Sequence, residues 1–444
     1  MTTCATELLD KLASRRAIVA VIGLGYVGLP LIRAVAESGL TAIGIDTDPT
    51  KIEMLKAGRN YLKHTGGEWI APLVEAGRLR PTGDFATLAE ADVIVICVPT
   101  PLTRHMQPDL SYVEATARSI APHLAPGRLV VLESTTWPGT TTEVLKPILE
   151  TSGLSCGRDF FVAFSPERAD PGNAEYDATG RIPKVIGGDG AEAREAACAF
   201  YGLFVERIVP VENAATAEAV KLFENIFRSV NIALVNELKV VYRAMGIDIW
   251  QVIEAAKTKP FGFMPFYPGP GLGGHCIPID PYYLSWKAKE FDVRSQFVEL
   301  AGEINSAMPR WVVDRLAEAL DRSAGTGLSR AHVLVVGIAY KKNVDDTRES
   351  PALRLIELLE SRGARTSFHD PWAPVIPPTR EHAALGGRRS VPLDPATIAD
   401  YDAVLIVTDH DNVDWSALAE ARLVVDTRNR AEREGLAGPR LVKL

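Results

Sequence analysis

The chain has 444 residues, of which 47% are hydrophobic and 23% charged, so it exceeds one hydrophobic core and two or three soluble domains are expected. Its formal net charge of −8 disfavours nucleic acid and acidic membrane surfaces as partners. The five cysteines are scattered without zinc-ligand spacing, so we expect no metal site and a reducing, cytoplasmic compartment.

The first half of the chain alternates strand-like and helix-like segments. A polar helix at 5–15, a β-branched strand at 17–22, a helix at 29–38 and a strand at 41–45 are expected, and the last three form a βαβ unit. The apolar runs have the length of buried parallel strands and are too short to span a bilayer. The next expected elements are a strand at 93–98, a helix at 111–123, a strand at 129–132 and a helix opened by a capping box, Thr140 to Glu143.

The pattern changes near residue 214. Residues 214–245 contain neither Gly nor Pro and are followed by Gly246, which predicts one unusually long helix. Residues 260–281 are rich in Pro and Gly and predict a functional loop. After helices at 283–324, a second strand–helix series begins at 331–337. The expected domains are an α/β domain at 1–210, a helical domain at 211–310 and a second α/β domain at 311–444.

A glycine loop follows the first strand directly and opens the next helix. The three glycines of a GxGxxG loop permit a tight turn, close approach of a pyrophosphate and close packing of helix on strand. Asp46 ends the next strand, where a carboxylate binds ribose hydroxyls and repels a 2′-phosphate, so NAD is favoured over NADP. Lys51 lies close by in the sequence and weakens that preference. The loop residues are Gly23, Leu24, Gly25, Tyr26, Val27 and Gly28.

These features predict the fold class. We expect an α/β protein with two Rossmann-like parallel-sheet domains joined by a helical central domain that contains one long helix. In the second α/β domain Gly337 stands alone in place of a triple-glycine loop, so a dinucleotide is less expected there. The basic side chains of residues 340–348 are candidates for holding a diphosphate.

Cys276 is a candidate nucleophile. A lone cysteine is most often a small buried apolar residue. Here two glycines precede His275 and Cys276, and Asp280 follows four residues later. The glycines let a substrate approach the backbone, and a thiolate attacks aldehydes readily. His275 is a candidate activator or metal ligand, but adjacent side chains rarely point to one place, so a structural role is favoured for it.

Polar residues on the long helix and after two strands are further candidates. Glu218, Lys221 and Asn225 share one helix face, either as a solvated Glu–Lys pair or as groups that stabilise an oxyanion in a cleft. Ser134 and Thr135 follow a strand at the sheet edge where ligands gather, although turn chemistry explains such hydroxyls equally well. Glu167 likewise follows an aromatic strand.

With these residues in view, the chain resembles the UDP-glucose/GDP-mannose dehydrogenase family along almost its whole length. The stretch PFGFMPFYPGPGLGGHCIPIDPYYLSWKA most resembles its UDP-N-acetylglucosamine 6-dehydrogenase branch. The resemblance implies an NAD-binding domain, a helical dimerisation domain and a nucleotide-sugar domain. The matching segments are VIGLGYVGLP, CVPTP, ESTTWPGTT, FSPER, EAVKLFEN, GPGLGGHCIPIDP and GIAYKKNVDDTRES.

The resemblance also implies a reaction, the four-electron oxidation of a sugar C6 alcohol to a carboxylate with two NAD⁺. Cys276 matches the family nucleophile, which forms a thiohemiacetal and then a thioester. Lys221 matches the residue that stabilises the oxyanion, with Asn225 assisting. Asp280 matches a carboxylate that orders or activates a water. Thr135 and Glu167 match residues near that water, with Glu167 as the base.

The remaining expected contacts follow from the same matching positions. The expected cofactor contacts are Gly23, Leu24, Gly25, Tyr26, Val27, Gly28, Asp46, Lys51, Pro99, Thr100, Ser134, Thr135 and Arg348. The expected substrate contacts are Glu167, Arg168, Lys221, Asn225, Phe266, Tyr267, Gly271, Gly273, Tyr340 and Lys341.

One departure from the family pattern limits these expectations. The UDP-glucose branch has an arginine before the glycine-rich loop, whereas residues 257–262 contain none, and Lys259 is the candidate replacement. UDP-N-acetylglucosamine is the first expected substrate, while UDP-glucose, TDP-glucose and other N-acetylhexosamine nucleotides stay open. A homodimer through the long helix is expected. The alternatives are a two-electron β-hydroxyacid-type dehydrogenase and a non-enzymatic nucleotide-binding regulator.

Overall fold

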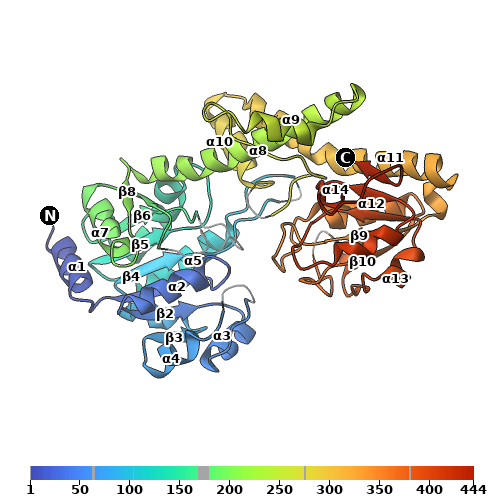
Figure 1. The fold of residues 1–444 in the computed structure, drawn as a ribbon. Coiled ribbons are helices and arrows are strands. Elements are labelled where there is room, and N and C mark those ends of the chain that lie inside the picture. Colours follow the sequence, from blue (N-terminus) through green and yellow to red (C-terminus); the bar gives the residue numbers. More distant parts are fainter. Residues whose placement is uncertain (1, 63–65, 104, 169–179, 275–276, 380–381) are drawn as a thin grey trace. The chain divides into compact units, whose positions relative to one another are not determined.

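The computed structural model describes residues 2–62, 66–103, 105–168, 180–274, 277–379 and 382–444. The chain divides into two compact units (Figure 1). Unit 1 contains Met1–Glu224 and Tyr282–Val293, and unit 2 contains Asn225–Pro281 and Arg294–Leu444. The division falls inside the long helix α8 (Ala214–Ala244), which therefore contributes residues to both units.

Unit 1 is built on an eight-stranded sheet in the order β3-β2-β1-β4-β5-β6-β7-β8. Its paired strands are parallel except β6 and β7, which run antiparallel. Strands β1, β4 and β6 are apolar throughout because helices cover both faces of such a sheet. The strands are β1 (Ile18–Ile22), β2 (Thr41–Ile45), β3 (Leu79–Thr82), β4 (Val93–Ile96), β5 (Arg128–Leu132), β6 (Phe160–Phe164), β7 (Lys184–Gly188) and β8 (Ile208–Pro210).

Helices α1, α2 and α7 share one buried core with the first strands of this sheet. Leu8 of α1, Leu29 of α2 and Phe200 of α7 are almost completely buried in it, together with Val19 and Val21 of β1. The helices of unit 1 are α1 (Thr3–Ala13), α2 (Gly28–Glu37), α3 (Pro49–Lys56), α4 (Ile70–Glu75), α5 (Ser111–Ile120), α6 (Lys146–Leu149), α7 (Ala191–Tyr201) and α10 (Asp280–Ala288), whose first two residues belong to unit 2.

The predicted capping box is wrong. Thr140 has the helical φ of −56° and caps nothing with its side chain, which donates instead to the Trp137 carbonyl at 2.8 Å. Glu143 forms an ion pair with Lys287 at 2.6 Å. The physical reason is that a distant carboxylate, Glu218, already accepts the free N–H groups of this turn, so no local cap is needed.

Unit 2 combines the rest of α8 with further helices and a five-stranded parallel sheet in the order β10-β9-β11-β12-β13. Helices α11 and α12 bury Leu316, Leu320 and Leu355 against β9 and β11. The elements are α9 (Ile249–Ala256), α11 (Gln296–Ala324), α12 (Pro351–Ser361), α13 (Pro395–Ala399), α14 (Arg430–Arg433), β9 (His332–Val336), β10 (Arg365–His369), β11 (Ala403–Ile406), β12 (Val424–Asp426) and β13 (Leu441–Lys443).

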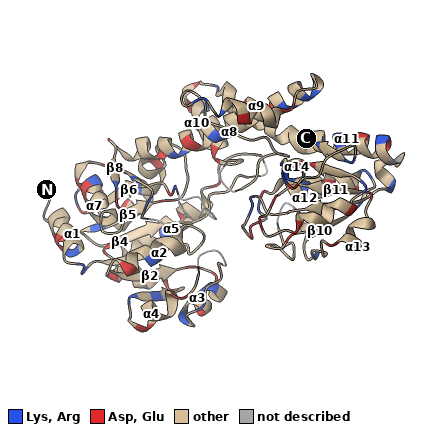
Figure 2. Cartoon of the chain, viewed as in Figure 1, with Lys and Arg blue, Asp and Glu red and all other residues tan. Residues whose placement is uncertain are grey.

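The fold class predicted from the sequence is confirmed. Two α/β sheets, each built mainly of parallel strands, are separated along the chain by a helical region that contains α8. No helix in the described part of the chain is both long and apolar enough to cross a bilayer. Acidic and basic residues are interspersed along the helices of both units (Figure 2).

Candidate functional site

The glycine loop of unit 1 has two glycines that pack closely and one that faces open space. A Cβ on Gly23 would lie 2.5 Å from the Cys97 carbonyl oxygen, and one on Gly28 would lie 1.9 Å from the Gly23 carbonyl oxygen. A Cβ on Gly25 meets no protein atom within 4 Å. Helix α2 begins at Gly28 without a side-chain cap from Val27. Leu29 and Leu31 already donate to the Gly25 and Val27 carbonyls and Pro30 has no N–H, so among the described residues of this turn the Gly28 N–H is the one left for a ligand. The loop fits a bound pyrophosphate.

Asp46 is held beside this loop by three hydrogen bonds. Its carboxylate accepts from the backbone N–H of Leu24 at 2.9 Å and of Asp48 at 2.9 Å, and from the Lys51 ammonium at 3.0 Å. Lys51 is therefore paired with the acid and is not a free cation for a 2′-phosphate. Tyr61 donates to the Leu24 carbonyl and closes the same corner. This arrangement fits the ribose of NAD.

The hydroxyl residues after β5 differ from one another in the structure. The Ser134 hydroxyl donates to the Val98 carbonyl at 2.7 Å, so it joins the segments that follow β5 and β4. Thr135 is half-exposed, while its neighbour Thr136 is buried. Close to the predicted Pro99 and Thr100, the Tyr283 hydroxyl donates to the Thr100 carbonyl at 3.0 Å. Among Ser134, Thr135 and Thr136, Thr135 is thus the most accessible.

In unit 1, polar side chains on one face of α8 form hydrogen bonds with neighbouring segments. The Glu218 carboxylate accepts from Gly139 N–H at 2.5 Å, and from the backbone N–H and hydroxyl of Thr141 at 2.9 and 2.7 Å. Burial raises the pKa of Glu218 to about 7. Lys221 donates to the Glu167 carbonyl at 2.5 Å. The alternative of a solvated Glu–Lys pair is therefore wrong, because the two side chains have separate buried or half-buried partners.

Two other predicted residues flank this contact. The Glu167 carboxylate accepts from the Arg168 N–H at 2.8 Å and from the Lys184 ammonium at 3.0 Å. The Arg168 guanidinium, expected to bind substrate, pairs with Glu224 of α8 at 2.5 Å and donates to the Pro183 carbonyl at 2.8 Å. Glu167 is consequently fixed at its carbonyl, by Lys221, and at its carboxylate.

In unit 2 the structure joins Asn225 to Asp280. The Asn225 amide donates to the Asp280 carboxylate, and its carbonyl accepts from Arg228. Asn225 and Asp280 are both buried. The sequence offered both as candidates without predicting that they touch. Cys276 and His275 lie outside the described residues.

The glycine-rich loop of unit 2 is held by residues that the sequence reasoning missed. Gly269 donates from its N–H to Asn236 at 2.9 Å and accepts at its carbonyl from Lys239 at 3.1 Å. Asn305 of α11 accepts from Asn236 at 2.9 Å. Arg428 lies over the loop, since a Cβ on Gly269 would come within 3.0 Å of its guanidinium. Polar residues on the apolar face of α8 were the signal that could have revealed this network.

The aromatic candidates lie within the same loop or pack against it. Tyr340 packs on the backbone of Gly273 and Gly274, where added Cβ atoms would come within 3.0 Å of it. Tyr267 donates to Glu254 at 2.8 Å. Phe266 meets Phe227 edge-to-face at 5.6 Å, Tyr267 stacks on Trp250, and Gly271 has φ +137° beside Pro309 and Pro351.

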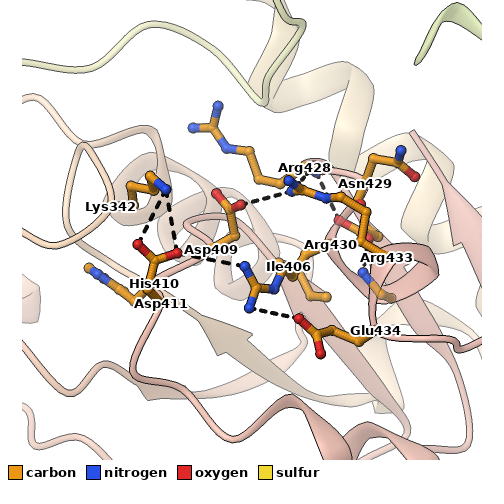
Figure 3. Close-up of polar contacts among 12 residues, drawn as sticks. Lys342, Ile406, Asp409, His410, Asp411, Arg428, Asn429, Arg430, Arg433 and Glu434 are labelled. Carbon is orange, nitrogen blue, oxygen red and sulfur yellow. Dashed lines mark hydrogen bonds and ion pairs between the residues drawn. The ribbon is translucent and has the colours of Figure 1, made fainter. Parts of the chain in front are cut away.

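Charged residues gather where β11 and β12 end (Figure 3). Arg428 donates to the Val407 carbonyl at 2.8 Å, and Arg433 pairs with Asp409 at 3.0 Å. Lys342 contacts Asp411 at 3.3 Å. Arg348, an expected cofactor contact, pairs with Asp346 at 2.8 Å, and the neighbouring candidate Lys341 is half-exposed.

The second Rossmann-like sheet has its own acidic residue at the position equivalent to Asp46, but that residue is fully occupied. Asp370 accepts from Ile338 N–H at 2.7 Å, Ala339 N–H at 3.0 Å and His410 at 3.0 Å, and it is 1% exposed. A ribose has no access to this carboxylate. The buried His410 thus takes the place beside this carboxylate that a ribose hydroxyl would need. Among the described residues no cluster of metal ligands occurs.

Comparison with known proteins matches the chain in three consecutive segments. Three family models of the UDP-glucose/GDP-mannose dehydrogenase family match: the NAD binding domain at residues 17–205, the central domain at 215–307 and the UDP binding domain at 334–433. Together they account for most of the chain, and the first supports NAD as the cofactor.

Relatives of known activity span nearly the same length. UDP-N-acetyl-D-mannosamine dehydrogenase of Pyrococcus horikoshii is 35% identical over 93% of this chain and 95% of its own. Its solved structure superimposes with a TM-score of 0.83 over the same shares of the two chains. UDP-N-acetyl-D-glucosamine 6-dehydrogenase of Pseudomonas aeruginosa is 34% identical over 88% and 90%. NDP-N-acetyl-D-galactosaminuronic acid dehydrogenase of Ralstonia nicotianae is 34% identical over 92% and 95%.

Proposed function

Because this chain belongs to the UDP-glucose/GDP-mannose dehydrogenase family, and is an NAD-dependent nucleotide-sugar dehydrogenase, we propose that it oxidises the C6 alcohol of a UDP-linked N-acetylhexosamine to a carboxylate. The observation that carries the proposal is the consecutive match of all three family domains. A two-electron β-hydroxyacid-type dehydrogenase needs no UDP binding domain, and a binding-only regulator needs none of the predicted catalytic residues.

The cofactor half of the proposal rests on the glycine loop. Gly25 leaves room for the pyrophosphate, the Gly28 N–H at the start of α2 would donate to it, and Asp46 would accept from the ribose. Bound NAD⁺ supplies the hydride acceptor, one molecule for each oxidation. The product NADH must leave after the first oxidation while the sugar is retained.

Retention of the sugar is the proposed work of Cys276. The first oxidation would transfer a hydride from C6 to NAD⁺ and release a proton from the C6 hydroxyl group, which gives an aldehyde. The Cys276 thiolate adds to the aldehyde carbon to form a thiohemiacetal, and loss of a second hydride gives a thioester. Water then attacks the thioester carbonyl, the C–S bond breaks, and the carboxylate leaves as the thiolate is regenerated. No free aldehyde is released.

The contacts of the other candidates support distinct roles. Lys221 carries its ammonium on the face of α8 that contacts the Glu167 carbonyl, and it is proposed to stabilise the negative oxygen at C6. Asn225 and Asp280, which hydrogen-bond to each other, are proposed to act as one unit that orders water. Glu167 is proposed as the base that removes a proton from that water, with Thr135 close to it.

The sugar is proposed to carry an acetamido group. The relatives reported above act on N-acetylated mannosamine, glucosamine or galactosamine derivatives according to their names. UDP-N-acetylglucosamine is the first choice among them. Lys259 is the candidate replacement for the arginine of the glucose branch. Its ammonium lies 5.1 Å over the Phe261 ring, and this contact adds no support for a role in sugar binding.

The decisive experiment is an NADH-production assay on a panel of UDP-N-acetylglucosamine, UDP-N-acetylmannosamine, UDP-N-acetylgalactosamine, UDP-glucose and TDP-glucose. We expect two NADH per sugar and a uronic acid product with an acetamido sugar. One NADH per substrate without acid formation would favour the two-electron alternative, and NAD binding without turnover would favour a regulator. A Cys276→Ser protein that completed both oxidations at the wild-type rate would contradict the thioester route.

We also propose a homodimer through α8. Five apolar side chains recur on this helix at intervals of four and seven residues and are exposed. An apolar stripe of this length favours burial against a second copy. Leu234→Asp is expected to shift the sedimentation coefficient from dimer to monomer, and a wild-type monomer would contradict the proposal. The residues are Phe223 (71% exposed), Phe227 (41%), Leu234 (49%), Val241 (45%) and Met245 (63%).

A further inference from the structure

A fully buried charge cluster lies behind Glu167 in unit 1. The Lys184 ammonium of β7 bridges two carboxylates, at 3.0 Å from Glu167 and 3.1 Å from Glu133, which follows β5. The side chains of Lys184 and Glu133 are 4% and 0% exposed. Tyr201 of α7 donates its hydroxyl to Glu133 and turns its ring toward Lys184 at 5.1 Å.

Stability does not explain this cluster. Removing a lysine and a glutamate from water costs several kcal/mol per ion, and well-packed apolar residues are often as good or better. The cluster is also incompletely satisfied, because the second carboxylate oxygen of Glu133 is buried without a hydrogen-bond partner. The cluster is better explained by its effect on Glu167. Of its three charged residues, Glu167 is the one that is half-exposed.

We propose that Lys184 is a positioning residue that keeps the Glu167 carboxylate aimed and ionised for the water-attack step, and that Glu133 moderates the charge of Lys184 from behind. The inference rests on the proposed function, in which Glu167 takes the proton of the water that attacks the thioester carbonyl. The hydroxide oxygen bonds to C6, the C–S bond breaks, and the sulfur leaves as thiolate.

The charged and titratable groups around Lys184 and Glu167 determine in which direction each substitution is expected to shift the pH–rate profile. Burial opposes the charge of Lys184, but Glu133 and Glu167 raise its pKa, so it stays protonated. Burial raises the pKa of Glu133 while Lys184 lowers it. Tyr201 and Cys97 also face the cluster, and burial raises the pKa of both, so both stay neutral. On the α8 side Lys221 contacts the Glu167 carbonyl, and Arg168 is paired with Glu224.

Two variants of opposite sign test the inference. Lys184→Met removes the cation beside Glu167, so the acid limb of the pH–rate profile for acid formation is expected to rise by about one to three pH units. Glu133→Gln keeps the acceptor for Tyr201 but removes a like charge, so the same limb is expected to move to lower pH. Lys184→Arg keeps the cation and is expected to restore most of the wild-type profile.

A second measurement separates positioning from general damage. When water attack becomes rate-limiting, the nucleotide-sugar thioester accumulates, and intact-protein mass spectrometry after an acid quench is expected to show the added mass in Lys184→Met. The matched control is Lys146→Met, which removes another lysine–carboxylate pair of unit 1, Lys146–Asp189 at 2.8 Å, and is expected to leave the profile unchanged.

Each outcome is decisive. Two NADH per sugar from the wild-type enzyme is measured first, and its absence rejects the proposed function, not the role of Lys184. Once that is established, the inference is overturned if the acid limbs of the pH–rate profiles of Lys184→Met and Glu133→Gln match that of the wild-type enzyme. A loss of activity that is equal at every pH, without the added mass, overturns it also. If Lys184→Met does not fold, the downward shift in Glu133→Gln still decides.

Discussion

Gly25→Ala is expected to abolish tight NAD binding while leaving the fold intact. The structure offers a matched comparison, because a Cβ at Gly25 meets nothing within 4 Å, whereas one at Gly28 would lie 1.9 Å from a backbone oxygen. The φ of Gly25 lies outside the left-handed region, so alanine fits its backbone. Alanine at Gly25 is therefore expected to cost no stability and even to add about 0.4–1 kcal/mol through the unfolded chain.

The same Gly25→Ala substitution is expected to weaken NAD binding. The open space beside Gly25 is where the pyrophosphate is expected to approach the backbone, so a methyl group there displaces it. Loss of one charge-assisted hydrogen bond costs about 1.5–3 kcal/mol, which corresponds to about 10- to 150-fold in Kd. Gly28→Ala, in contrast, forces the helix away from the loop and is expected to cost about 1–3 kcal/mol of stability or more.

Isothermal titration calorimetry with NAD and thermal melting of both variants measure these quantities. The expected pattern is an unchanged melting temperature with weak binding for Gly25→Ala, and a lowered melting temperature for Gly28→Ala. Wild-type NAD affinity in Gly25→Ala would refute the placement of the pyrophosphate. A melting temperature lowered equally in both variants would refute the distinction between the packed and the open glycine.

Other predictions follow from buried and paired charges. Asp46→Ser frees Lys51, so we expect at least about tenfold weaker NAD binding and a raised ratio of NADP to NAD efficiency in steady-state kinetics, whereas an unchanged ratio would contradict the role of Asp46. Burial, with Arg428 and Arg243 nearby, lowers the pKa of Lys239 to about 7, below its unfolded value. The unfolded chain therefore binds the extra proton between pH 7 and the unfolded pKa of about 10.4, and this group adds stability as pH rises through that window. Lys239→Met is accordingly expected to gain about 2–3 kcal/mol more relative to wild type at pH 6 than at pH 9 in denaturant unfolding, and an equal gain at both values would contradict the burial of a charged lysine.

Much of the architecture could be predicted from the sequence because its signals are local. The βαβ unit that begins the fold depends on an apolar run, a glycine loop and a helix that are adjacent in the chain. Strand β2 was predicted with the bounds it has, and α8 ends one residue from its predicted end. Gly and Pro punctuate these elements through backbone geometry alone, which needs no tertiary partner.

The site was predicted less completely, because its residues contact partners that lie far away in the sequence. Lys221 and Asn225 were identified by type and spacing, but their contacts, Glu167 and Asp280, lie 54 and 55 residues away in the chain. The capping box failed because Glu218, 77 residues from Thr141, satisfies that turn. No local pattern contains such information.

The sequence by itself thus determined the fold class, the glycine loop with Asp46, and the residue types available for chemistry, because periodicity and backbone constraints act over a few residues. Only the tertiary structure decided which polar groups are buried and paired. It revealed Lys184 and Glu133 behind Glu167, Lys239 beneath Gly269, and Asp370 closed by His410. The cost of burying a charge depends on partners that only folding brings together.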